Sequence, residues 1–147
     1  MRKGKKRVIT GFGIVLLVLL PLVFFFYLSF HTVVVQGVSM MPTFKPNQRL
    51  LVSDAYWLIG PIREKDIVVV REKEIPNGYF IKRVYRTGGE EVDYANYPKG
   101  YSIRQATFKV PEGTVFLLGD NRPQSEDSRS FGPVELSRII GKVVVRP

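Results

Sequence analysis

The stretch Ile67-Val68-Val69-Val70-Arg71 is followed by Pro76-Asn77-Gly78 and then by Tyr79-Phe80-Ile81-Lys82-Arg83-Val84-Tyr85-Arg86. β-Branched and aromatic residues favour strands, and a Pro-Asn-Gly segment favours a tight turn, so this part of the chain predicts a β-hairpin. Alternation along the second strand places Lys82 on the same face as Phe80 and Val84. A lysine among apolar neighbours is unusual, because charged side chains are rarely buried.

Five other short segments have the same strand-like composition and are separated by residues that favour turns. They are residues 32–35, 50–53, 107–110, 114–118 and 141–145. We expect each to be a strand, with turns at 97–100 and 111–113 and one short helical turn at 134–140. This spacing predicts a mainly β fold: a compact, barrel-like antiparallel domain that is closed or nearly closed.

Residues 8–30 contain no charged side chain, and five lysine or arginine residues lie within residues 2–7. A run of roughly 20 apolar residues spans about 30 Å as a helix, which is enough to cross a bilayer. The positive-inside bias then places residues 1–7 in the cytoplasm. It leaves residues 31–147 as one β-rich domain on the extracytoplasmic side of the cell membrane. A cleaved secretory signal is the competing interpretation, but bulky Phe and Tyr residues end the run, without a small-x-small exit.

The formal net charge is +9, and the basic head supplies five of these charges. The remaining excess of about four is not clustered with stacking aromatic residues, so we expect no nucleic-acid partner. The chain contains no cysteine, which excludes disulfides and thiolate metal sites. We expect no cofactor.

Ser39 lies in the segment Gly37-Val38-Ser39-Met40-Met41-Pro42-Thr43. Gly37 frees the backbone before the serine, and Pro42 restricts the residue that precedes it. A hydroxyl in such a loop can face a substrate while its own backbone N–H stabilises the oxyanion of acyl transfer, an effect worth about 3 kcal/mol. An ordinary turn serine that bonds its own backbone is the alternative.

Lys82 is the candidate base for this serine, because the only histidine, His31, directly follows the hydrophobic run. At a reference pKa near 10.4, only about one lysine in 2,500 is neutral at pH 7. A general base has to be neutral, and burial lowers the pKa of an amine. The alternative is an edge-strand lysine whose amine reaches water.

The closing segment, residues 119–132, is dense in small polar and charged residues. Polar groups packed this closely must satisfy one another or face water. We expect Asp127 and Arg129 to form a charge-assisted pair that holds a loop in place, with Asp120 near them. A solvated acidic loop is the alternative.

Two other interpretations of the closing segment concern Ser125 and a metal. The Ser125 hydroxyl can hydrogen-bond the amine of Lys82 and orient its lone pair. Asp120, Glu126 and Asp127 carry oxygen ligands suited to a cation. The arginines interleaved with these carboxylates argue against a cation, so we expect no metal.

Together, and in this order, the segments resemble type I signal peptidases, the membrane-bound Ser/Lys endopeptidases. The resemblance covers nearly the whole chain. It is carried by the N-terminal anchor, the serine segment 37–43, the strand segments 66–70 and 79–84, and the closing segment 119–132. The short stretch 91–107 leaves no room for the large extra β-domain of some members.

The resemblance implies Ser39 as nucleophile, Lys82 as general base and Ser125 as the hydroxyl that positions the lysine amine. Some relatives carry a second oxyanion donor, a serine hydroxyl two residues before the nucleophile. This chain has Gly37 at that position, so a second donor has to come from elsewhere.

Four further residues have implied supporting roles. Asp127 and Arg129 match the family's structural ion pair, and Asp120 lies near it in the family pattern. Met40 is expected to line the pocket for the substrate residue before the cleaved bond.

The implied function is the removal of N-terminal signal peptides from exported preproteins, after small-x-small sites of the Ala-x-Ala kind. The expected partners are these preproteins and the lipid bilayer. A dedicated Ser/Lys maturation or pilin-processing peptidase would have the same catalytic core. A non-catalytic membrane-tethered β scaffold is an alternative of another class, and it predicts no labelling of Ser39 by an acylating probe.

Overall fold

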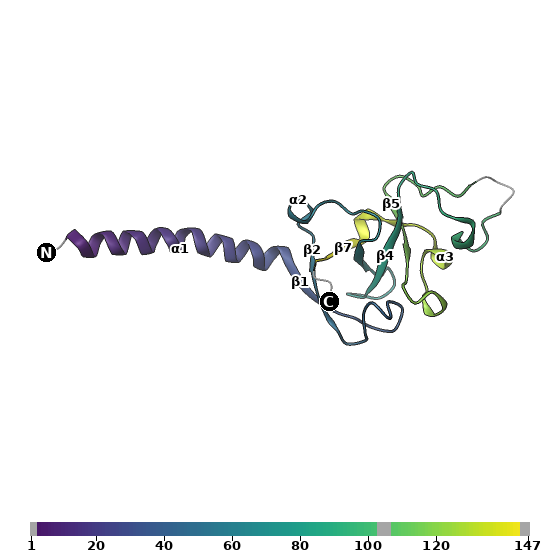
Figure 1. The fold of residues 1–147 in the computed structure, drawn as a ribbon, viewed down its shortest axis with the longest axis horizontal. Helices are drawn as coiled ribbons and strands as arrows, with labels where there is room; N and C mark the ends of the chain where they lie inside the picture. Colours follow the sequence, from purple (N-terminus) through teal and green to yellow (C-terminus); the bar gives the residue numbers. More distant parts are fainter. Residues whose placement is uncertain (1–2, 103–106, 145–147) are drawn as a thin grey trace.

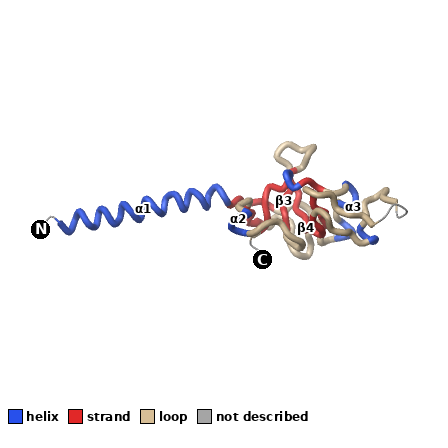
Figure 2. Tube along the Cα trace, turned by 90° about the horizontal axis from the view of Figure 1, so that it is seen from above, coloured by secondary structure: helices blue, strands red, loops and turns tan. Residues whose placement is uncertain are grey.

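A long N-terminal helix leads into a β-rich domain in the computed structural model, which describes residues 3–102 and 107–144 (Figure 1). The helix, α1, runs from Lys3 to Ser29 with Pro21 inside it. Its apolar part, Gly11–Ser29, has 19 residues, of which only the last, Ser29, is buried within the protein. Such a helix is about 28 Å long, so its length and composition suit a membrane span. Figure 2 shows it projecting away from the domain.

Seven strands form one sheet in the order β1-β2-β7-β3-β4-β5-β6, with every neighbouring pair antiparallel. The strands are β1 (Phe30–Val34), β2 (Arg49–Ser53), β3 (Ile67–Arg71), β4 (Tyr79–Thr87), β5 (Thr114–Leu118), β6 (Val134–Glu135) and β7 (Ile139–Val143). The short helices are α2 (Tyr56–Ile59) and α3 (Ser128–Phe131), with 3₁₀ turns η1 (Tyr94–Asn96), η2 (Arg122–Gln124) and η3 (Leu136–Arg138). The expected mainly antiparallel β-domain is confirmed.

The sheet is open, however, so the expectation of a closed or nearly closed barrel is wrong. β1 and β6 lie at the two ends of the strand order, and each pairs with one neighbour within residues 3–102 and 107–144. β6 has two residues and pairs with β5 alone in the part of the chain that the structure describes.

Three expected elements differ in detail. Residues 107–110 form one isolated bridge, Glu91 to Lys109, instead of a strand of the sheet. The helical turn expected at 134–140 is confined to η3, because β6 and β7 take the residues on either side. The last strand begins and ends earlier than expected, and its expected final residue, 145, lies outside the described residues.

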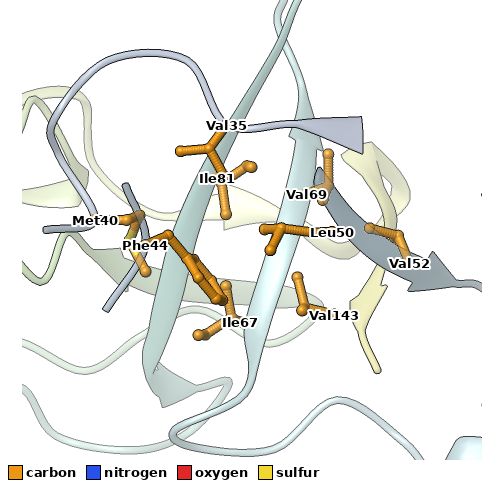
Figure 3. Close-up of a cluster of buried hydrophobic side chains, with 9 residues drawn as sticks. All are labelled: Val35, Met40, Phe44, Leu50, Val52, Ile67, Val69, Ile81 and Val143. Atoms are coloured by element: carbon orange, nitrogen blue, oxygen red, sulfur yellow. The ribbon is translucent and has the colours of Figure 1, made fainter. Parts of the chain in front are cut away.

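The hairpin between β3 and β4 forms as predicted and lies at the centre of the domain (Figure 2). Asn77 in its turn has a φ of 59°, a left-handed conformation that asparagine tolerates. Apolar clusters cover both faces of β3, so its first four residues are all buried. Figure 3 shows one of these clusters, made of Val35, Met40, Phe44, Leu50, Val52, Ile67, Val69, Ile81 and Val143.

Candidate active site

Ser39 lies in the loop that joins β1 to β2, and it is partly exposed. Gly37 has a φ of 74°, which is unfavourable for any residue with a side chain and explains the glycine. Directly behind the serine, Met40 and Phe44 are buried in the core, and the Phe44 N–H donates to the Met40 carbonyl over 2.9 Å (Figure 3). The core therefore holds the loop in place directly after the serine.

Met40 does not have the position expected of it. Its side chain is 1% exposed and packs in the same buried cluster as Phe44 and Ile81, so it does not line an open pocket (Figure 3). Burial of the large methionine side chain stabilises the loop instead.

Lys82 lies in β4, opposite Val68 of β3, and is 4% exposed. Its Nζ is 2.8 Å from the Oγ of Ser39, which is hydrogen-bond distance. Phe80 and Val84 belong to the apolar cluster on the same face, as alternation along the strand predicts. β4 is flanked by β3 and β5, so the alternative of an edge-strand lysine that reaches water is excluded.

Burial also changes the proton affinity of this amine. It lowers the pKa of Lys82, while the negative charges of Asp127 and Glu126 act in the opposite direction. A larger fraction of the amine is therefore neutral near pH 7 than for a lysine in water. A neutral amine at this distance can accept the proton of the serine hydroxyl.

Asp127 and Arg129 form the predicted ion pair. Arg129 donates from Nε to Oδ1 over 2.9 Å and from its terminal nitrogen to Oδ2 over 3.0 Å. The fully buried carboxylate of Asp127 also accepts from the Gly119 N–H and caps α3. Burial by itself raises the pKa of Asp127, but the hydrogen bonds from Arg129 and Gly119 outweigh it and hold the pKa below its usual range.

Ser125 lies close to this pair but does not bond the lysine amine as expected. Its Oγ is buried and has no hydrogen-bond partner among the described residues. It is near enough to Asp127 to help lower the pKa of that carboxyl, without the geometry of a hydrogen bond. A Cβ on Gly119 would lie within 3 Å of both Ser125 and the Ser39 carbonyl oxygen, so only glycine fits between the closing segment and the serine loop.

Asp120, which was expected to lie near the Asp127–Arg129 pair, forms an ion pair of its own with Arg83. Arg83 donates to both carboxylate oxygens, over 2.8 and 2.6 Å, and the Thr43 hydroxyl donates to Oδ2 over 2.5 Å. These bonds outweigh the effect of burial and lower the pKa of Asp120. Asp120 therefore joins the serine loop to the lysine strand, through two partners that the sequence analysis did not select.

Asn121 is a second residue that the sequence analysis missed. Its backbone N–H donates to the Ser39 carbonyl over 2.9 Å, and its side-chain Nδ2 donates to the Val38 carbonyl over 3.1 Å. The two bonds fix the peptide groups on both sides of Ser39. Asn121 was visible only as one residue of the closing segment, and no local pattern distinguished it.

An open groove of about 850 Å³ gives access to the serine and the lysine. Its walls are the loop residues 36–39, the hairpin residues 72–75, Phe80 and parts of the closing segment, including Gln124, Glu126 and Phe131. A groove between a loop and a hairpin can hold an extended peptide, because exposed backbone on both sides can pair with it.

The family described as signal peptidase, peptidase S26, matches residues 6–99 and 96–146. A solved crystal structure of a signal peptidase I from Enterococcus faecalis V583 has a TM-score of 0.45 and 25% identity. The matched region covers 57% of this chain and 97% of the chain in the crystal structure.

Curated relatives are similar over most of the chain. Signal peptidase I of Bacillus caldolyticus is 34% identical, over 80% of this chain and 79% of that protein. Signal peptidase IB of Staphylococcus aureus (strain COL) is 30% identical, over 76% of this chain and 74% of that protein. Mitochondrial ATP-independent inner membrane protease subunit 1b of Arabidopsis thaliana is 39% identical, over 75% of this chain and 65% of that protein. From the family match and the two bacterial relatives, the chain belongs to the signal peptidase family, peptidase S26.

Proposed function

We propose that this chain is a signal peptidase I in which Ser39 is the nucleophile and Lys82 the general base. Its family membership makes it a serine endopeptidase. The observation that carries the residue assignment is the 2.8 Å distance between Ser39 Oγ and Lys82 Nζ, together with the burial of the lysine.

In the acylation step, neutral Lys82 takes the proton from the Ser39 hydroxyl while the oxygen attacks the scissile carbonyl carbon. The tetrahedral intermediate collapses, the C–N bond breaks, and the protonated amine of Lys82 gives its proton to the leaving nitrogen. Lys82 is then neutral again and removes a proton from the water that attacks the acyl-enzyme ester. Release of the carboxyl product returns the proton to Ser39.

The backbone N–H of Ser39 is the proposed donor to the oxyanion. In a trans peptide the carbonyl of Val38 and the N–H of Ser39 point in opposite directions. The hydrogen bonds that the Val38 carbonyl accepts from Asn121 Nδ2 and from the Met41 N–H therefore fix the direction of the Ser39 N–H. A donor that is oriented beforehand stabilises the transition state without reorganisation.

The substrate is an exported preprotein with its signal peptide still attached. Its cleavage region would lie extended in the groove and pair with exposed backbone. Cleavage after small-x-small sites of the Ala-x-Ala kind is what the family resemblance implies for the side chains accepted there.

The apolar helix α1 is the proposed anchor, with residues 1–7 cytoplasmic, 8–30 in the cell membrane and 31–147 outside the cytoplasm. The basic head supports this orientation through the positive-inside bias. An anchor keeps the groove near the bilayer, where the cleavage region of a signal peptide also lies, and so raises the effective concentration of substrate.

The test is to incubate the full-length protein in detergent with a model preprotein and to sequence the new N-terminus. We expect one cut after a small-x-small site, and no cut by the Ser39→Ala variant, whose circular dichroism should match that of the parent. Turnover by a folded Ser39→Ala protein would remove the nucleophile assignment.

A dedicated maturation peptidase is the second candidate, because a relative 39% identical to the chain is named as a mitochondrial inner membrane protease subunit. Several unrelated preproteins in the same assay separate the two. Cleavage of all of them supports the general signal peptidase, and cleavage of one alone supports the dedicated enzyme.

A further inference from the structure

The short helix α2 lies beside the last turns of α1 (Figures 1 and 2). The ring of Trp57 in α2 contacts the ring of Phe25 in α1, with 5.3 Å between centroids. The hydroxyl of Ser53, at the end of β2, donates to the carbonyl of Ser29 over 2.7 Å and fixes the end of α1 against the sheet. The position of α2 relative to the apolar helix is therefore set by two separate contacts.

These contacts place α2 at a definite position along the axis of α1. The apolar stretch of α1 ends at Ser29, and Phe25 lies four residues earlier, about 6 Å back along the helix axis. Trp57 lies beside Phe25, so it is level with the last turn of the span and not beyond its end. If α1 crosses a bilayer, Trp57 is at the membrane boundary.

The side chains of α2 suit that boundary. Trp57 is 75% exposed and Leu58 is 50% exposed, so two large apolar side chains on one short helix are largely accessible. Tryptophan concentrates at membrane interfaces, because its ring is apolar and its indole N–H is polar. Exposed Asp54, just before α2, limits how deeply this end can sink, since a carboxylate is costly in hydrocarbon.

We propose that α2 is a membrane-contacting helix that inserts Trp57 and Leu58 into the outer boundary between lipid headgroups and acyl chains. The proposal rests on the anchoring of α1 given above. α1 passes directly into β1 at Phe30, so α1 and α2 together make a two-point attachment. Two points fix the rotation of the domain on the membrane, and with it the direction in which the groove opens.

The test uses the fact that Trp57 is the only tryptophan in the chain. The full-length Ser39→Ala protein is reconstituted into phosphatidylcholine and phosphatidylglycerol vesicles, with or without brominated phosphatidylcholine. We expect blue-shifted emission, strong quenching by the brominated lipid and weak quenching by iodide on both sides of the bilayer. The matched control is Trp57→Phe/Tyr94→Trp, because Tyr94 is 65% exposed and lies in η1, outside α1 and α2. Its emission should be quenched by iodide and not by the brominated lipid.

Two results with Trp57 would overturn the proposal. Quenching by iodide alone would place α2 in water, and quenching by neither agent would place it against protein, for example a second copy of this chain. Flotation of the protein with the vesicles tests the anchor separately from α2. Protein that does not float would refute the anchor and the proposal together. The catalytic assignment does not enter this measurement, because the Ser39→Ala protein is inactive by design.

A functional measurement completes the test. Trp57→Ser/Leu58→Ser, with Ser39 intact, should cleave a preprotein in the same vesicles severalfold more slowly than the parent. Cleavage of a short soluble peptide in detergent should be unchanged, because neither residue lines the groove. If the variant and the parent cleave the vesicle-bound preprotein at equal rates, an orienting role is contradicted. An equal loss of cleavage rate on the preprotein and on the soluble peptide would also contradict it.

Discussion

Ser39 and Lys82 meet at 2.8 Å, yet they come from two regions with opposite properties. Lys82 belongs to a nine-residue strand between two other strands and is 4% exposed. Ser39 belongs to a loop and is partly exposed. The proposed base needs a dry and rigid site, which a central strand provides, whereas the proposed nucleophile must reach a peptide that arrives from solvent.

The loop obtains its precision from elsewhere in the chain. Asn121 holds the peptide groups around Ser39, and Asp120 binds Thr43 in the same loop. Asp127 in turn holds Gly119 at the start of the closing segment. The strand region is therefore ordered by its own sheet, while the serine region depends on a segment about 80 residues later.

The largest effect is expected at Lys82, because the proposed base depends most on the dry and rigid site that the central strand provides. Lys82→Arg keeps a positive charge but cannot act as a base, because arginine does not lose its proton. We expect kcat to fall by about 10²- to 10⁴-fold in a preprotein-cleavage assay. Lys45→Arg, at an exposed lysine, is the control and should be unchanged. An active Lys82→Arg protein would mean that Lys82 contributes only its charge.

The two ion pairs of the closing segment should differ in their effect on stability. Asp127→Ala removes a fully buried carboxylate and leaves the Gly119 N–H unpaired, so we expect a loss of about 2–4 kcal/mol in the free energy of unfolding. Asp120→Ala should cost about 1–2 kcal/mol, because Asp120 and Arg83 are partly exposed. Urea titrations measure both values. The reverse order would contradict the structure.

Asn121→Leu removes the side-chain bond to the Val38 carbonyl but leaves the backbone bond to Ser39. We expect kcat to fall by about tenfold, equivalent to about 1.4 kcal/mol, with KM nearly unchanged, because the oxyanion develops in the transition state and is absent from the bound substrate. Asn121→Asp should lose more, since its oxygens repel the carbonyl. Unchanged kcat, or a loss matched by a large drop in melting temperature, would argue against a positioning role.

The smallest effect is expected at Glu126, on the rim of the groove. Its negative charge raises the pKa of Lys82, so Glu126→Gln should lower that pKa further. With Lys82 as the proposed base, the cleavage rate should rise with pH as the amine loses its proton, and in the Glu126→Gln variant this rise should move to lower pH. The shift is small, because Glu126 is exposed and water screens its charge. Glu135→Gln, at another exposed carboxylate, is the control for the kcat–pH profiles, and a shift to higher pH would contradict the argument.

Local pattern was enough to predict much of the fold and part of the site. Alternation in residues 79–86 predicted the face that Lys82 shares with Phe80 and Val84, and the turn residues predicted the hairpin. The pair of Asp127 and Arg129 was also predictable, because its members lie two residues apart. The catalytic roles of Ser39 and Lys82 stay predictions until the variants are assayed.

Long-range partners were not predictable in this way. Arg83 and Asp120 are 37 residues apart, and Thr43 and Asp120 are 77 apart, so no local pattern connects them. The inward position of Met40, and a Ser125 hydroxyl with no hydrogen-bond partner in the described part of the chain, depend on how the loop and the closing segment pack. The open sheet was not predictable either, because which strands pair at its two ends depends on the whole domain, and β6 lies where a helical turn was expected.

The sequence by itself determined an apolar helix, a set of short strands and the two side chains proposed for catalysis, because these depend on residue type and spacing. Only the tertiary structure decided that Ser39 meets Lys82, that Asn121 holds the serine loop and that Trp57 lies beside Phe25. Each of these contacts joins residues far apart in the chain. Their formation depends on how the strands pair and how the core packs, and these are properties of the whole domain and not of any segment.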